Sequence, residues 1–62
     1  MSEEEILKKG RRADVVFVDG NYYDIEHIDE QVLYIFDVHK QDYQYRLREL
    51  TDKKLAFFKK IK

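Results

Sequence analysis

The feature that most restricts this sequence is the combination of a short chain with the absence of cysteine. A domain of about 60 residues buries only about 60% of the surface that its unfolded chain exposes, so its stability is modest. Without cysteine, neither a disulfide nor a cysteine-ligated structural zinc can reinforce the fold. We therefore expect a single small domain over residues 1–62, held by its own core or by burial shared with a partner.

The composition is that of a folded chain with a well-solvated surface. Hydrophobic residues make up 44% of the sequence, which is enough for a core, and charged residues make up 40%. No apolar run approaches the roughly 18 residues that a membrane span needs, and the first ten residues do not resemble a secretory signal. We expect no membrane association and a cytoplasmic location.

The N-terminus carries a helix start signal. Ser2 followed three residues later by Glu5 is a capping box, in which side chains and backbone N–H groups at the start of a helix bond reciprocally. Gly10 can adopt the left-handed conformation that often ends a helix. The pattern predicts a short helix over residues 3–9.

The middle of the chain is predicted to form β-strands. Runs rich in β-branched and aromatic residues occupy 13–18, 22–28, 32–39 and 43–50, and Asp19-Gly20-Asn21 is a turn signal between the first two. In the fourth run, apolar and polar residues alternate with the period of two that a half-buried strand shows. The predicted fold class is α+β and mainly β, a four-stranded antiparallel meander for which a strongly curled, SH3-like sheet is one arrangement.

One register places the larger apolar residues on a single face. A three-residue loop at 19–21 and four-residue loops at 28–31 and 39–42 pair Phe17 with Tyr23 and Tyr23 with Phe36. The face predicted to be the core then carries Val15, Phe17, Tyr23, Ile25, Tyr34, Phe36, Tyr45 and Leu47. The opposite face carries Val16, Val18, Tyr22, Leu33 and Ile35 among charged residues, so both faces should receive some cover.

The segment from Thr51 to Lys62 fits two structures. Leu55, Phe58 and Ile61 recur at helical spacing, whereas Leu55, Phe57 and Ile61 also fit a strand. We favour a C-terminal helix because the segment contains good helix formers and lysines near its end. The alternative is a fifth strand that closes a barrel.

The chain offers little for catalysis. Ser2 and Thr51 are its hydroxyl nucleophiles, and both stand where capping is the ordinary explanation. In the register above, His27 and His39 lie about 20 Å apart, too far to share a metal. We expect no enzymatic activity, cofactor, metal site or small-molecule substrate.

Charge is unevenly distributed along the sequence. Residues 13–45 hold eight acidic residues and one lysine, whereas residues 46–62 hold seven basic and two acidic ones. We expect a protein-interaction or regulatory module that binds another protein or a second copy of itself. The alternative is a nucleic-acid-binding module in which basic clusters near both termini contact phosphates and sheet aromatics stack on bases. The candidate binding residues are Lys8, Lys9, Arg11, Arg12, Tyr22, Arg46, Arg48, Lys59 and Lys60.

Overall fold

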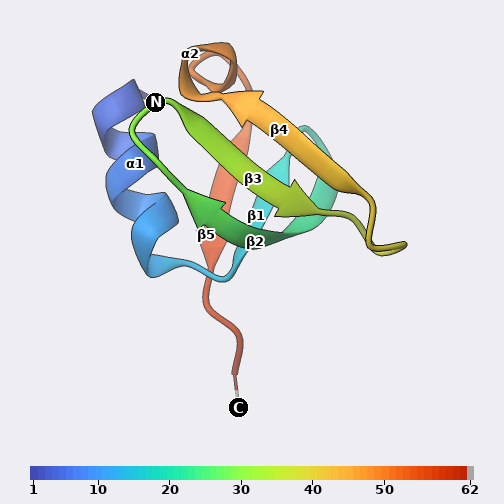
Figure 1. Ribbon diagram of the computed structural model, residues 1–62. Helices are drawn as coiled ribbons and strands as arrows, with labels where there is room; N and C mark the ends of the chain where they lie inside the picture. The colour runs from blue at the N-terminus through green and yellow to red at the C-terminus, as the bar shows by residue number, and fades with distance from the viewer. Residues whose placement is uncertain (62) are drawn as a thin grey trace.

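The computed structural model of this chain describes residues 1–61 and confirms a mainly β, α+β fold (Figure 1). All five strands form one antiparallel sheet in the order β4-β3-β2-β1-β5, which is not closed into a barrel. The elements are α1 (Glu3–Arg12), β1 (Val15–Val18), β2 (Asn21–Ile28), β3 (Val32–Phe36), β4 (Asp42–Arg46), α2 (Leu47–Leu50) and β5 (Leu55–Phe58).

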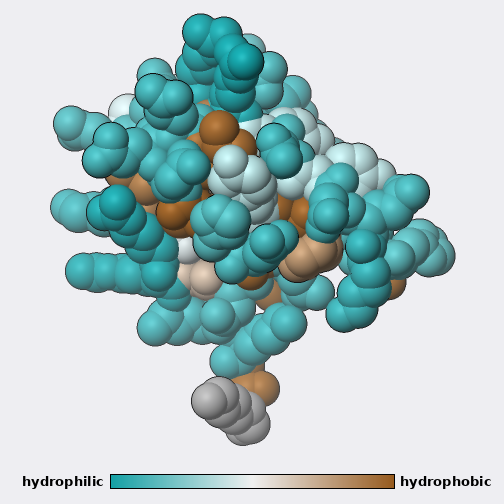
Figure 2. All heavy atoms as spheres, in the orientation of Figure 1, coloured by the Kyte–Doolittle hydropathy of each residue, from teal (hydrophilic) through white to brown (hydrophobic). Residues whose placement is uncertain are grey.

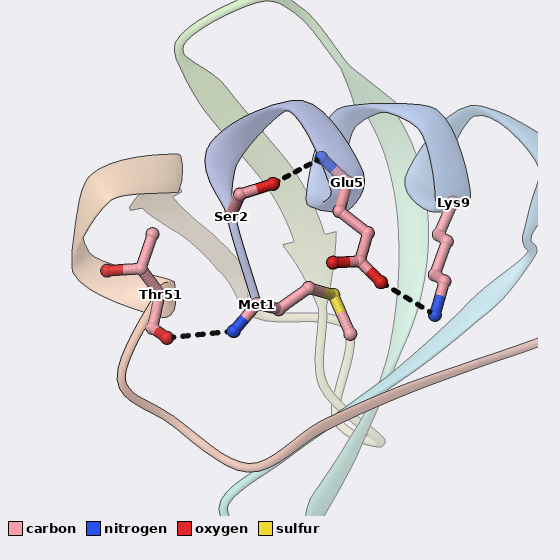
Figure 3. Close-up of polar contacts among 5 residues, drawn as sticks. All are labelled: Met1, Ser2, Glu5, Lys9 and Thr51. Atoms are coloured by element: carbon pink, nitrogen blue, oxygen red, sulfur yellow. Dashed lines mark hydrogen bonds and ion pairs between the residues drawn. The ribbon is translucent and has the colours of Figure 1, made fainter.

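The predicted start of α1 at Glu3 is correct, and of the two bonds of the predicted capping box the structure gives the one accepted by Ser2. The Ser2 hydroxyl oxygen accepts a hydrogen bond from the Glu5 backbone N–H at 3.2 Å, and the Glu5 carboxylate lies 3.4 Å from the Lys9 ammonium (Figure 3). The Met1 amine donates to the carbonyl oxygen of Thr51 at 3.2 Å. This bond ties Met1, two residues before α1, to Thr51, the residue that follows α2.

The predicted end of α1 is wrong. The helix continues through Gly10 to Arg12, and Gly10 is buried inside it. A Cβ atom at Gly10 would lie 2.7 Å from Cδ1 of Ile28 in β2. Glycine at this position therefore lets the helix approach the sheet closely, and it does not end the helix.

The predicted registers are wrong as well. The first hairpin has a two-residue turn at Asp19 and Gly20, both at positive φ, so Phe17 pairs with Tyr22 and not with Tyr23. Positive φ at both central residues is typical of the tightest hairpin turns. The shift matters because slipping a strand by one residue turns its side chains to the opposite face.

Two irregularities change the other ladders. The β2–β3 register shifts between Ile25 and His27, where β2 contains a bulge or similar irregularity. The third strand ends at Phe36 and not at His39, because an Asp37 carboxylate oxygen accepts backbone N–H bonds from His39 at 2.8 Å and Gln41 at 2.9 Å. These bonds turn the chain directly into β4.

As a consequence, β1 and β3 turn the opposite faces to the core from those predicted, and their buried residues are Val16, Val18, Leu33 and Ile35. In β2, β4 and the residue after β4, the predicted residues do lie on the core side: Tyr23, Ile25, Tyr45 and Leu47. The two short helices lie on this side of the sheet, and Ile6, Leu47 and Leu50 contribute to the same buried cluster. Phe36, predicted to be core, is only partly buried on the opposite face, which we call the outer face. The fully or nearly buried residues are Ile6, Val16, Val18, Leu33, Ile35, Leu47 and Leu50.

The fourth predicted strand is shorter than expected, because residues 47–50 form α2. The Arg46 backbone N–H donates to the Glu49 carboxylate at 3.2 Å, and the Leu47 N–H donates to the Gln31 carbonyl oxygen at 2.9 Å. Leu47 and Leu50, three residues apart, both point into the core. A helical turn buries this pair, whereas a strand would turn them to opposite faces.

The C-terminal helix that we favoured is also wrong, since residues 55–58 form the strand β5 beside β1. Asp19 makes two hydrogen bonds to Lys54, the residue before β5. Its N–H donates to the Lys54 carbonyl oxygen at 3.0 Å, and its carboxylate accepts the Lys54 N–H at 2.8 Å. Phe57 then packs against the core opposite Val16. Lys62 lies outside the described residues.

Within residues 1–61, no helix has the length and apolar character needed to cross a bilayer.

Candidate interaction surface

Three aromatic side chains gather on the outer face, away from α1 and α2. Phe17 of β1 and Tyr22 of β2 are cross-strand partners whose rings meet edge to face, with centroids 5.0 Å apart. The Phe58 ring of β5 lies 6.0 Å from that of Tyr22. Tyr22 is 59% exposed and Phe58 is 46% exposed. We call Phe17, Tyr22 and Phe58 the aromatic cluster.

Polar contacts hold the segment after β5 against the same side of the molecule. The Lys60 ammonium lies 3.1 Å from the Asp24 carboxylate, and the Lys60 backbone N–H donates to the Asp14 carboxylate at 3.0 Å. Most of the side chains visible in Figure 2 are hydrophilic, with hydrophobic residues in smaller patches between them. Asp24 stands two residues after Tyr22 in β2, on the same face of the sheet, so the aromatic cluster has a charged pair beside it.

Next along the outer face, His27 stacks on Tyr34 with ring centroids 4.2 Å apart and planes 19° from parallel. The His27 imidazole also lies 3.7 Å from the Glu26 carboxylate, and both side chains are about half exposed. His27 and Glu26 are only two such side chains: within residues 1–61, no group of three or more histidine or carboxylate residues could hold a metal ion.

The remaining tyrosines have a packing role on the core side. Tyr23 meets Tyr43 and Tyr45 edge to face, at centroid distances of 5.8 and 6.5 Å. Burial, followed by the neighbouring Tyr45, raises the pKa of the Tyr23 hydroxyl above its ordinary value. Tyr23 and Tyr45 pack against the core, whereas Tyr43 is 39% exposed, so the abundance of tyrosine in the sequence does not by itself indicate a binding surface.

The predicted basic residues fall into two separate groups. Lys8, Lys9, Arg11 and Arg12 occupy the C-terminal half of α1, and the segment with Lys59 and Lys60 reaches the end of this helix through the Lys60 backbone, which bonds to Asp14, two residues after α1. The Lys60 ammonium itself pairs with Asp24 on the outer face. Arg46 and Arg48 instead line a depression with Glu3 at the other end of the helix. Ten helical residues span about 15 Å, so the structure does not join these arginines to the first group.

The free edge of β5 is a feature that the sequence prediction missed. Among residues 1–61, β5 pairs only with β1, which leaves its other side open. An open depression runs between this edge and the end of α1, and its lining contains two cations and no carboxylate: Met1, Lys9, Arg12, Ala13, Leu55, Ala56 and Phe57. Predicting a helix for this segment concealed the edge, although its strand-compatible spacing was the signal that pointed to it.

No protein-family model, curated protein or solved structure matches this chain.

Proposed function

We propose that this protein is a small, non-catalytic protein-interaction module that acts in the cytoplasm. The observation that carries the proposal is the aromatic cluster, in which Tyr22 and Phe58 remain about half exposed on a sheet face that neither helix covers. Tyrosine and other aromatic residues are enriched at protein interfaces, where they supply large contact areas at low conformational cost.

A non-catalytic role is supported by how the ionisable groups are solvated. Within residues 1–61, no polar or charged residue is buried. General acids and bases depend on shielded sites that shift their pKa values toward the working pH. The pKa values of Asp29 and Asp37 are lowered, chiefly by backbone hydrogen bonds within turns, which is a structural arrangement.

Nucleic-acid binding is the second candidate, favoured by the meeting of the two basic segments near Asp14. Lys8, Arg11, Arg12 and Lys59 would form the phosphate-binding surface. Against it, Lys9 and Lys60 already pair with carboxylates, and the formal net charge is −1, so long-range attraction to nucleic acid is weak.

The test compares the wild-type chain with the double variant Tyr22→Ser/Phe58→Ser as bait in extracts of the source cells. Both side chains are exposed, so the variant should fold, which thermal unfolding checks. Val38→Ser is the matched control, because Val38 is an exposed apolar residue outside the aromatic cluster. We expect a protein that wild type and control retain equally, that the double variant loses, and that nuclease treatment leaves bound.

Two other outcomes contradict the proposal. Retention that disappears on nuclease treatment and falls steeply between 50 and 200 mM salt, roughly the range over which phosphate contacts weaken, supports the nucleic-acid candidate. Equal retention by the double variant shows that the aromatic cluster is not the binding surface. Light scattering of the purified chain shows whether the chain binds a second copy of itself, which distinguishes self-association from binding to a different protein.

A further inference from the structure

We infer that the free edge of β5 binds an extended, acidic segment of the partner protein, which adds to the sheet as a further strand. This inference rests on the proposed function and names the chemistry of its partner. Strand addition obtains affinity from backbone hydrogen bonds and specificity from the side chains that alternate along the added segment.

The first support is the orientation of the β5 backbone. The Asp19 N–H bonds to the Lys54 carbonyl oxygen, so this pair marks the hydrogen-bonded positions of the β1–β5 ladder. Bonded positions alternate along an antiparallel pair, which directs the backbone groups of Leu55 and Phe57 away from β1. Those groups are available to an incoming strand.

The second support is the character of the depression beside the edge. Leu55 and Phe57 contribute an apolar floor. Arg12 from α1 supplies positive charge along one side, and Lys9 adds to it while also pairing with the Glu5 carboxylate at 3.4 Å. An added strand would direct alternate side chains toward this floor, since successive residues of a strand point to opposite faces. We therefore expect a segment in which apolar residues alternate with aspartate or glutamate.

Charge also argues against a second copy in this position. Two β5 edges placed side by side would bring together the cations of both chains, which disfavours pairing. The sheet's other edge is β4, and the nearby depression at Tyr45 mixes both signs through Arg48, Glu49, Asp52 and Lys53. The β5 edge is the better match for an acidic segment.

The probe is an acetylated and amidated heptapeptide in which glutamate alternates with valine, compared with its lysine–valine counterpart. Titration into the ¹⁵N-labelled chain, followed by amide chemical shifts and hydrogen exchange, locates the contact. We expect the acidic peptide to bind saturably and to protect the Leu55 and Phe57 amides, and the basic peptide to bind at least about tenfold more weakly.

Two variants, each with a matched control, test the mechanism. Chemical synthesis can place an N-methyl group on the Phe57 amide, which removes one edge donor and keeps the side chain; we expect about a tenfold loss of affinity. The control carries the N-methyl group on the Gln44 amide. Bonded positions also alternate along the β3–β4 ladder, which directs the Gln44 N–H away from β3 and toward the free edge of β4. Lys9→Gln/Arg12→Gln should weaken binding about fivefold at low salt, and Lys40→Gln/Arg48→Gln should leave it nearly unchanged.

Several outcomes overturn the inference. The first is that the acidic peptide does not bind saturably. The second is that it protects amides of β4 or of the aromatic cluster in place of those of β5. The third is that Lys9→Gln/Arg12→Gln, which does not alter the β5 backbone, binds the peptide with unchanged affinity. If a natural partner depends on Tyr22 and Phe58 but binds the N-methyl-Phe57 chain normally, the β5 inference fails while the proposed function stands.

Discussion

Truncating Ile35 and its neighbour Phe36 tests which face of β3 is the core. Ile35 is 0% exposed in the structure, whereas Phe36 lies on the outer face and is partly exposed. Ile35→Ala removes about three methylene-sized groups at about 0.8 kcal/mol each, or about 2.4 kcal/mol before the cavity adds its cost. Large-to-small changes of this kind cost about 2–5 kcal/mol in total.

Phe36→Ala should cost less, about 2 kcal/mol or below, because the ring is already partly in water and its loss opens no enclosed cavity. A chain of this length has a total stability of only about 3–9 kcal/mol, so Ile35→Ala removes a large share of it. Urea unfolding followed by circular dichroism measures both values, with sucrose added so that the weaker variant still folds.

The order of the two losses decides the question. If Phe36→Ala is the more destabilising substitution, the inward face of β3 carries Phe36, and our assignment of the core is wrong. Equal losses would mean that both faces are covered to the same extent, which is equally incompatible with the burial described above.

Two further measurements test particular contacts. In the wild-type background, the Cβ atom of Gly10→Ala would meet Cδ1 of Ile28, which Ile28→Val removes. We expect Gly10→Ala to gain up to about 1 kcal/mol of helix propensity only in the Ile28→Val background, so a double-mutant cycle should show a coupling above about 0.5 kcal/mol. Independent effects of the two substitutions would exclude this contact. The pKa of Asp37 is lowered in the folded chain, first by the hydrogen bond from the Gln41 N–H. Its charged form therefore stabilises the fold above the unfolded pKa of about 3.9, and this contribution is lost as the pH falls below that value through the lowered folded pKa. Asp37→Asn should be less stable than wild type at pH 7, and acid titration of stability should show the difference shrinking below about pH 4; a constant difference would assign Asp37 a role independent of its charge.

The sequence by itself determined the local structure where neighbouring residues provide the bonding partners. Ser2 and Glu5 lie three residues apart, so the start of α1 depended on nothing distant. The place of the first turn, predicted over 19–21 and formed by Asp19 and Gly20, and the presence of strands on either side of it were also predicted, since turn chemistry and side-chain branching act locally. The mainly β class followed from these elements.

Only the tertiary structure decided the registers, the core face and the fate of the last segment. A one-residue difference in the first turn and the shift in β2 turned β1 and β3 over relative to β2 and β4, which residue patterns could not resolve because both faces are partly apolar. Leu55 to Phe58 suit either a helix or a strand, and pairing with β1 selected the strand. Gly10 serves as a contact surface for Ile28, a role that no neighbour in sequence reveals.

The candidate binding surface divides in the same way. Tyr22 and the basic residues were named from composition and charge, but their grouping required the fold, which separates Arg46 and Arg48 from the remaining basic residues. Phe17 and Phe58 joined Tyr22 only through cross-strand pairing. The open edge of β5 exists because the sheet does not close, and sheet closure depends on the packing of the whole chain and not on any single segment.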